Sequence, residues 1–217
     1  MIPLVFDLDG TLIDSAPDIR AAANAVLDTR GVAPLTLAET ISFIGAGAPT
    51  FVARMRRARD LPEAEEGDLL AAFLAGYETD HALTAPYPQV LETLARLREA
   101  GHPLGLCTNK PIGPTHGVLK HFGLTPFFAS VIGGDSLSVR KPDPAPLKAV
   151  FDALGGLGLY VGDSETDAAT AEALGVPFLL FTKGYRKSAP EDLRPAAQFS
   201  DFGRLPEIVA EISARTR

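Results

Sequence analysis

The segment Val5-Phe6-Asp7-Leu8-Asp9-Gly10-Thr11 constrains the fold more than any other part of the sequence. The apolar residues that lead into it, 2–6, are typical of a buried strand in a parallel sheet. In an extended chain, residues i and i+2 point to the same side, so Asp7 and Asp9 would lie close together. Because neighbouring carboxylates repel each other, a cation or a shared proton must offset their charge. We therefore expect a magnesium site here; the alternative is a strand that simply ends in an Asp-Gly turn.

From about residue 86 onward, short apolar segments alternate with helical patterns. Strands are predicted at 103–107, 130–132, 157–161 and 177–181, and helices at 88–100, 115–122, 143–154, 165–174 and 205–212. This alternation predicts right-handed crossovers and an α/β fold with a doubly wound, Rossmann-like parallel sheet. Residues 15–84 show helical spacing and no strand pattern. We predict a core domain of residues 1–14 and 85–217, with a helical cap domain of residues 15–84 inserted after the first strand.

Groups that can bind a cation or an anion follow the expected strands. In an open parallel sheet, ligands bind outside the carboxyl ends of the strands. We therefore expect the polar residues at these ends to form one site; they are Asp7, Asp9, Thr108, Asn109, Lys110, Lys141, Asp163 and Asp167.

The overall charge excludes some classes of partner. The 217 residues carry 20 Lys and Arg against 27 Asp and Glu, a net charge of −7, and no basic cluster stands out. Nucleic acid and anionic membranes are therefore not expected as partners, whereas a small anionic substrate is compatible with a local metal ion and lysines. The single cysteine, Cys107, rules out an internal disulfide and fits a reducing compartment, so we expect a cytoplasmic protein. The sequence does not distinguish a monomer from a homodimer.

Four motifs resemble those of the haloacid dehalogenase superfamily, specifically its metal-dependent phosphatases. They are DLDGT from Asp7, CTNKP from Cys107, the lysine Lys141 within VRKPDP, and GDSETD from Gly162. The longer segments GTLIDSAPDI, IGAGAP and VGDSETDAATAEALGVP are similar to the bacterial phosphoglycolate phosphatases. This resemblance implies a Mg²⁺-dependent phosphate monoester hydrolase that forms an aspartyl-phosphate, with 2-phosphoglycolate as substrate.

The resemblance also implies roles for the four aspartates. Asp7 would be the nucleophile, and Asp9 would protonate the departing oxygen and later accept a proton from water. The Mg²⁺ ligands would be carboxylate oxygens of Asp7 and Asp163 and the backbone carbonyl of Asp9, with Asp167 binding through water. For Asp167, a favourable charge in the first turn of a helix remains an alternative.

Two lysines and their neighbours would bind the substrate. Thr108, with nearby backbone N–H groups, and Lys141 would hold the phosphoryl group, and Lys141 would also keep Asp7 ionised. Asn109 would also bind the substrate or its phosphate, and Lys110, which lies beside Thr108, would bind the glycolate end. The alternatives are a helix N-cap role for Thr108 and a solvated loop for Lys141.

Substrate specificity would come from the helical cap. The loop Gly45–Gly47 could reach over the site, and Arg54 could bind a carboxylate or be an exposed surface arginine. Alternative functions are a phosphatase or phosphomutase that acts on a small sugar phosphate or pyrophosphate, and a catalytically silent module that binds phosphate or a protein partner.

Overall fold

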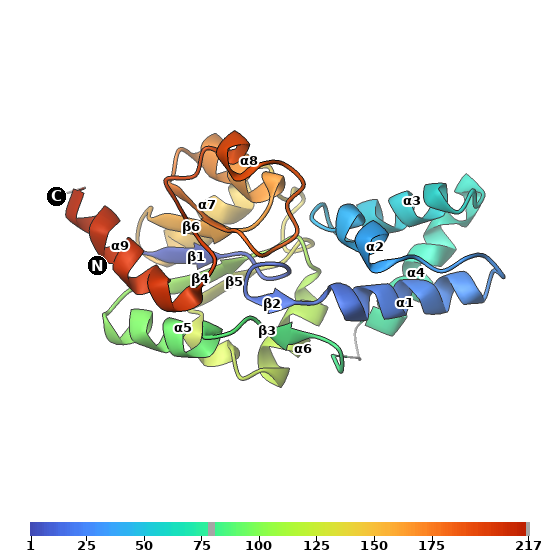
Figure 1. Ribbon diagram of the computed structural model, residues 1–217, viewed down its shortest axis with the longest axis horizontal. Helices are drawn as coiled ribbons and strands as arrows, with labels where there is room; N and C mark the ends of the chain where they lie inside the picture. Colours follow the sequence, from blue (N-terminus) through green and yellow to red (C-terminus); the bar gives the residue numbers. More distant parts are fainter. Residues whose placement is uncertain (78–80, 216–217) are drawn as a thin grey trace.

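The centre of the protein is a parallel sheet of six strands (Figure 1). The computed structural model describes residues 1–77 and 81–215. Strand β1 lies in the middle of the sheet, where Val5 pairs with Gly105 on one side and with Tyr160 on the other. The order is β5-β4-β1-β6-β7-β8, with β1 Leu4–Phe6, β4 Leu104–Cys107, β5 Ser130–Ile132, β6 Leu159–Gly162, β7 Phe178–Phe181 and β8 Ala197–Phe199. The predicted doubly wound α/β fold is confirmed, although β8 was not predicted.

Helices cover both faces of the sheet, so alternate residues of β1 are buried on opposite sides. Leu4 and Phe6 belong to one apolar cluster with residues of α5, α6 and α9, whereas Val5 belongs to another with residues of α7 and α8. Burial on both faces explains why β1 is continuously apolar. These helices are α5 Val90–Glu99, α6 Ile112–His121, α7 Ala145–Ala153, α8 Glu165–Leu174 and α9 Leu205–Arg215.

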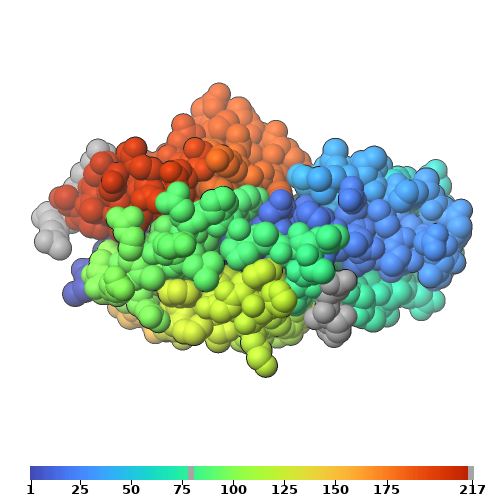
Figure 2. Space-filling model, turned by 60° about the horizontal axis from the view of Figure 1, so that its bottom comes forward, coloured from blue at the N-terminus to red at the C-terminus, as the bar shows by residue number. Residues whose placement is uncertain are grey.

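Residues 16–77 form a separate group of four helices, which we call the helical unit. Its helices are α1 Ala16–Asp28, α2 Leu37–Phe43, α3 Ala48–Ala58 and α4 Glu66–Tyr77. They enclose an apolar cluster of their own, which includes Leu27, Met55 and Phe73. The blue and cyan helical unit lies beside the carboxyl ends of the core strands along the long axis of the molecule (Figure 1), and it forms one end of the surface seen in Figure 2. Among the described residues, no helix is both long enough and apolar enough to span a membrane.

A short antiparallel ribbon connects the helical unit to the core. Strand β2 (Ile13–Asp14) pairs with β3 (Ala85–Pro86). Two-residue strands leave no periodicity in a sequence, so neither strand was predicted. The ribbon brings the two chain crossings together, and this fixes where the helical unit enters and leaves the core.

Candidate active site

A buried lysine lies at the carboxyl end of β1, between two carboxylates. Lys141 Nζ is 2.9 Å from Asp7 Oδ1 and 2.7 Å from Asp167 Oδ1, and it donates a 2.8 Å hydrogen bond to the Tyr160 hydroxyl. The Lys141 residue is 3% exposed. Burial acts to lower the pKa of Lys141, but Asp167 and Asp7 outweigh it and raise that pKa above its usual value. The ammonium therefore stays charged between its two partners.

The site holds more negative charge than Lys141 alone offsets. Carboxylate oxygens of Asp7, Asp163 and Asp167 all lie within 4.8 Å of one another. Burial raises the pKa of Asp7 to about 7, with Asp167 adding to the rise and Lys141 opposing it. Burial, followed by the charges of Asp167 and Asp7, raises the pKa of Asp163 well above its usual value. A carboxylate cluster that is short of positive charge fits a divalent cation with oxygen ligands, such as Mg²⁺.

Asp163 is held by groups from two distant segments. The Thr11 hydroxyl donates to Oδ1 at 2.7 Å, and the Tyr185 backbone N–H donates to Oδ2 at 2.6 Å. Gly10 packs against the same carboxylate: a Cβ atom at Gly10 would lie 2.5 Å from Asp163 Oδ2. Gly10 also has a φ of +83°, which favours glycine. The glycine of the Asp-Gly pair is thus needed both for the turn and for the position of Asp163.

Asp167 is saturated with hydrogen bonds. It forms a capping box with Ser164 at the start of α8. Its Oδ2 accepts bonds from the Ser164 hydroxyl at 2.6 Å and from the backbone N–H groups of Ser164 and Asp163 at 3.1 and 3.2 Å. Its Oδ1 accepts from Lys141 and from Tyr160. This geometry favours a role for Asp167 in fixing Lys141 over a direct bond to a metal ion.

Asp9 lies beside a different cation from Asp7. Lys110 Nζ is 3.4 Å from Asp9 Oδ1, and the Ser15 hydroxyl donates to the same oxygen at 2.6 Å. Ser15 precedes α1 as its N-cap residue, but its hydroxyl makes no capping bond. The two carboxylates of the first motif therefore each have a lysine partner, Lys141 for Asp7 and Lys110 for Asp9.

The residues after β4 adopt distinct roles. Thr108 Oγ1 accepts a 3.2 Å bond from the Lys110 backbone N–H. The alternative that Thr108 caps the next helix is wrong, because the N-cap residue of α6 is Pro111. Asn109 Nδ2 donates to the carbonyl oxygens of Gly45 at 3.0 Å and Lys141 at 2.9 Å. The side-chain amide of Asn109 thus bridges protein segments.

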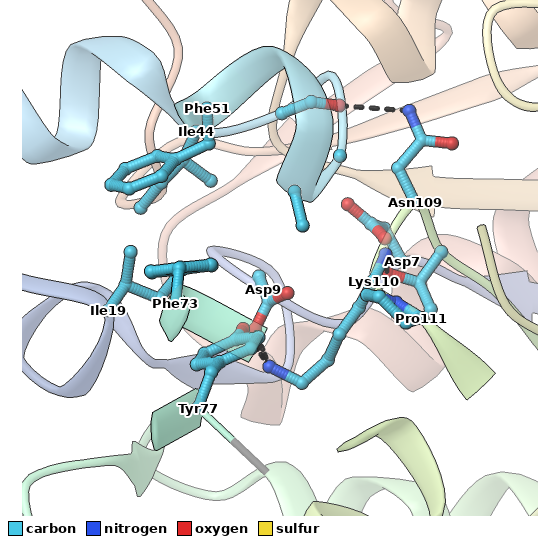
Figure 3. A pocket seen from close by; sticks show the side chains of 14 residues that line it. Asp7, Asp9, Ile19, Ile44, Phe51, Phe73, Tyr77, Asn109, Lys110 and Pro111 are labelled. Atoms are coloured by element: carbon cyan, nitrogen blue, oxygen red, sulfur yellow. Dashed lines mark hydrogen bonds and ion pairs between the residues drawn. The ribbon is translucent and has the colours of Figure 1, made fainter. Parts of the chain in front are cut away.

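A small cavity of about 50 Å³ lies between the helical unit and the core. Lys110 extends across it toward Tyr77 and Asp9, as Figure 3 shows. On the side of the helical unit, its walls include the apolar side chains Ile19, Ile44, Phe51 and Phe73. The cavity therefore offers a buried cation in largely apolar surroundings, next to Asp7 and Asp9.

Residues 4–181 match the model of the haloacid dehalogenase-like hydrolase family. The chain belongs to this family. The resemblance inferred from the four motifs is thereby confirmed, and with it the expectation of an enzyme.

Similar proteins agree with the family assignment over nearly the whole chain. A phosphoglycolate phosphatase of Cereibacter sphaeroides (strain ATCC 17029) is 49% identical over 215 residues, which are 97% of this chain and 99% of that protein. A phosphoglycolate phosphatase of Rhodobacter capsulatus is 48% identical, with 95% of each chain covered. The crystal structure of a predicted phosphoglycolate phosphatase from Haemophilus somnus 129PT superimposes with a TM-score of 0.87 at 30% identity, covering 95% of this chain and 96% of that one.

In the present protein, the loop with Gly45 and Gly47 lines the small cavity and also borders a second cavity of about 290 Å³. Arg54 lines the second cavity, and its Nη1 donates to the Phe43 carbonyl at 2.9 Å. Arg54 thus ties the end of α2 to α3 and holds the loop between them. Its neighbours Arg56 and Arg59 form ion pairs with Glu66 and Glu39.

Several polar groups of the site were not predicted from the sequence. Tyr160 and Tyr77 occupy positions whose spacing predicts buried core residues, yet their hydroxyls reach Lys141 and Lys110. Tyr185 follows β7 in a loop without a motif. Thr11 was within reach of prediction, because it belongs to the DLDGT motif and directly follows Gly10.

Proposed function

We propose that this protein is a Mg²⁺-dependent phosphate monoester hydrolase that acts on 2-phosphoglycolate through an aspartyl-phosphate on Asp7. The observation that carries the proposal is the buried cluster of Asp7, Asp163, Asp167 and Lys141, whose carboxylates lack sufficient positive charge. The names of the two similar phosphatases described above support the choice of substrate.

Asp7, Asp163 and the backbone carbonyl of Asp9 would hold the metal ion, and Asp167, whose oxygens already accept hydrogen bonds, would hold Lys141 beside Asp7 rather than bind through water. A bound Mg²⁺ neutralises charge on both the nucleophile and the phosphoryl oxygens, so that one anion can approach another. Side chains of the protein position the nucleophile and bind the phosphoryl group. Lys141 lowers the pKa of Asp7 against the effect of burial and binds a phosphoryl oxygen, and Thr108 donates a hydrogen bond to another.

The reaction has two steps, which share one proton carrier. An oxygen of Asp7 attacks phosphorus while the bond to the leaving oxygen breaks, and Asp9 gives that oxygen its proton. Asp9 then removes a proton from a water molecule that attacks the phosphorus of the aspartyl-phosphate. The P–O bond to Asp7 breaks, inorganic phosphate leaves, and both aspartates return to their starting states.

The cavity next to Asp9 favours a small acidic leaving group. Its volume of about 50 Å³ is a few times the roughly 10–15 Å³ that one water molecule needs, which suits a small leaving group. Lys110 supplies the positive charge that a glycolate carboxylate needs. These two features favour 2-phosphoglycolate over sugar phosphates.

The helical unit acts as the cap in this proposal, with the domain boundaries at residues 14/15 and 84/85. The two connections at the β2–β3 ribbon support this division, because the chain crosses between the two parts there. The loop at Gly45–Gly47 closes over the nucleophile, and Arg54 holds it. A cytoplasmic location rests on the single buried Cys107 and remains a prediction.

Turnover of a panel of phosphate esters tests the proposal. Release of inorganic phosphate is measured for 2-phosphoglycolate, glucose 6-phosphate and pyrophosphate, with Mg²⁺ and with EDTA. We expect metal-dependent release with a clear preference for 2-phosphoglycolate; equal rates on glucose 6-phosphate would overturn the substrate assignment. Interconversion of glucose phosphates without net release of phosphate would indicate a mutase.

Two aspartate variants test the nucleophile. Asp7→Asn keeps the shape of the side chain, so we expect it to abolish hydrolysis while the protein remains folded. The matched control is Asp192→Asn, at an exposed aspartate in the 3₁₀ helix Pro190–Leu193, which should keep full activity. Hydrolysis by Asp7→Asn at the wild-type rate would show that Asp7 is not the nucleophile.

A further inference from the structure

Lys110 and Tyr77 meet across the boundary between the core and the helical unit. Lys110 follows β4 in the core, whereas Tyr77 is the last residue of α4. The Lys110 ammonium donates a hydrogen bond to the Tyr77 hydroxyl, and Nζ lies 3.8 Å from the centroid of the Tyr77 ring. One aromatic side chain of the helical unit therefore contacts the cation through both its hydroxyl and its π face.

Both residues are removed from solvent. Lys110 is 5% exposed and Tyr77 is 7% exposed. The Tyr77 ring stacks on Phe73 with centroids 5.2 Å apart, and Phe73 stacks on Phe51 at 5.1 Å. This column of three rings fixes the direction of the Tyr77 hydroxyl. A hydroxyl fixed in this way is a preorganised hydrogen-bond partner.

The Tyr77 hydroxyl retains a proton to donate. It accepts from Lys110, which uses one of its lone pairs, and burial raises its pKa well above the usual value. Its O–H is thus available to an acceptor in the cavity, which both Tyr77 and Lys110 line. An ammonium and a hydroxyl side by side make a site for a carboxylate, which accepts hydrogen bonds on both oxygens.

The Lys110–Tyr77 pair also lies close enough to Asp9 for one substrate to contact all three residues. Lys110 Nζ is 3.4 Å from Asp9, the residue proposed to protonate the leaving oxygen. In 2-phosphoglycolate the carboxyl carbon is two bonds from that oxygen. A carboxylate bound by Lys110 and Tyr77 would therefore leave the bridging oxygen beside Asp9.

We propose that Tyr77 is a specificity-determining residue whose hydroxyl, together with the Lys110 ammonium, binds the carboxylate of the leaving group. The inference rests on the proposed function and extends it. The substrates that this pair would select form a class, the phosphate esters of short hydroxy acids. Because Tyr77 belongs to the helical unit, the carboxylate subsite is complete only when the helical unit is docked on the core. Substrates without a carboxylate would not gain from this docking.

The test compares two esters that differ only in the carboxylate. Steady-state kinetics are measured on 2-phosphoglycolate and on ethyl phosphate for the wild type, Tyr77→Phe and Tyr87→Phe. Tyr77→Phe keeps the ring and its stacking but removes the hydroxyl. Tyr87→Phe is the matched control, because the Tyr87 hydroxyl lies near the Lys183 carbonyl, at 3.4 Å, and Tyr87 lines neither cavity at the site.

For Tyr77→Phe we expect kcat/KM on 2-phosphoglycolate to fall by about tenfold or more, as for a lost hydrogen bond to a charged group. Most of the loss should appear in KM, and kcat/KM on ethyl phosphate should stay within about twofold. Inhibition by glycolate should weaken in parallel, while inhibition by inorganic phosphate should not change. Tyr87→Phe should behave as the wild type on both esters.

Failure of the inference and failure of the proposed function look different. If the wild type does not prefer 2-phosphoglycolate over ethyl phosphate, the proposed substrate is wrong and the subsite falls with it. If the wild type has the preference but Tyr77→Phe keeps it, or loses rate equally on both esters, the proposed function stands. Tyr77 would then be a structural contact between the helical unit and the core, and the inference would be wrong.

Discussion

Asn109 Nδ2 lies 3.0 Å from the carbonyl oxygen of Gly45, so a single hydrogen bond joins the core to the loop of the helical unit beside Asp7 (Figure 3). The second Nδ2 hydrogen goes to the Lys141 carbonyl at 2.9 Å. Two carbonyl acceptors require an NH₂ group, which fixes the orientation of the amide. The loop at Gly45 and the segment that carries Lys141 are therefore positioned by the same side chain.

Replacement of Asn109 by aspartate should separate these two segments. Asn109→Asp would direct a carboxylate at two carbonyl oxygens, so both hydrogen bonds are lost and repulsion replaces them. We expect kcat/KM on 2-phosphoglycolate to fall by at least about tenfold, because displaced catalytic groups lose rate steeply.

Asn24→Asp provides the control for this change. Asn24 Nδ2 donates to the Leu35 carbonyl at 3.2 Å, entirely inside the helical unit. This variant should lower the melting temperature but leave kcat/KM within about twofold of the wild type, as expected for a site remote from the chemistry. Equal losses of activity in the two variants would show that the bridge at Asn109 has no special part in the site.

Removal of the Lys141 ammonium should affect activity and stability together. Lys141→Met leaves Asp7 and Asp167 without their shared partner, and loss of one member of a buried ion pair costs about 3–5 kcal/mol. Loss of a preorganised charge at a reacting group lowers kcat by about 10²–10³. Urea unfolding and phosphate release measure the two effects.

Lys148→Met is the matched lysine variant. Lys148 pairs with Asp152 at 2.7 Å on the surface of α7, where its side chain is 58% exposed. Exposed pairs contribute little, so this change should alter the free energy of unfolding by less than about 1 kcal/mol and leave turnover unchanged. A loss of stability for Lys141→Met no greater than that of Lys148→Met would contradict the buried network.

The convergence of the candidate site residues could be predicted from the sequence, because the geometry of a parallel sheet brings strand ends together. Asp7, Lys141 and Asp163 come from three separate strand ends, and the structure places them around one point. Periodicity indicates which side of an element a residue occupies, but it does not show how far a buried hydroxyl reaches. For that reason Tyr160 was predicted only as a buried strand residue, although its hydroxyl lies 2.8 Å from Lys141 Nζ.

Local geometry after β1 was predicted only in part. The sequence predicted two neighbouring carboxylates at Asp7 and Asp9, with an Asp-Gly turn as the alternative. The chain does turn at Gly10, but the isolated bridge between Asp9 and Ile13 was not predicted. Strand β8 was missed because three residues at the edge of the sheet, only one of them fully buried, carry too little pattern to distinguish a strand from a loop.

Removal of metal should make the stability of the protein depend on pH. The pKa of Asp7 is raised from 3.8 to about 7 in the fold, and that of Asp163 is also raised, so the folded state binds protons that the unfolded state has released. In EDTA, stability should therefore fall as pH rises from about 4 to about 7, by on the order of 1 kcal/mol per pH unit for Asp7. Burial acts to raise the pKa of Asp167, but Lys141 outweighs it and lowers that pKa, so Asp167 does not add to this decline.

Melting temperatures at pH 5 and pH 7.5, with EDTA or with excess Mg²⁺, measure this effect. Mg²⁺ should raise the melting temperature more at pH 7.5 than at pH 5, because a bound cation replaces the protons. Asp7→Asn in EDTA should show a weaker decline with pH than the wild type. A metal-free protein that becomes more stable between pH 5 and pH 7.5 would contradict the raised pKa values.

Gly10→Ala should disturb Asp163 without touching a charged side chain. The new Cβ would lie 2.5 Å from Asp163 Oδ2 and 2.7 Å from the Tyr185 ring, and the φ of +83° adds backbone strain. Gly31→Ala measures the effect of backbone strain without a steric clash, because Gly31 has a φ of +64° and nothing lies within 4 Å of its Cβ position. Gly31→Ala should cost about 1–2 kcal/mol of stability and leave the Mg²⁺ concentration for half-maximal activity unchanged. Gly10→Ala should cost more than this and raise that Mg²⁺ concentration, because Asp163 must move away from Asp7. Similar Mg²⁺ dependence in the two variants would mean that Asp163 does not hold the metal ion.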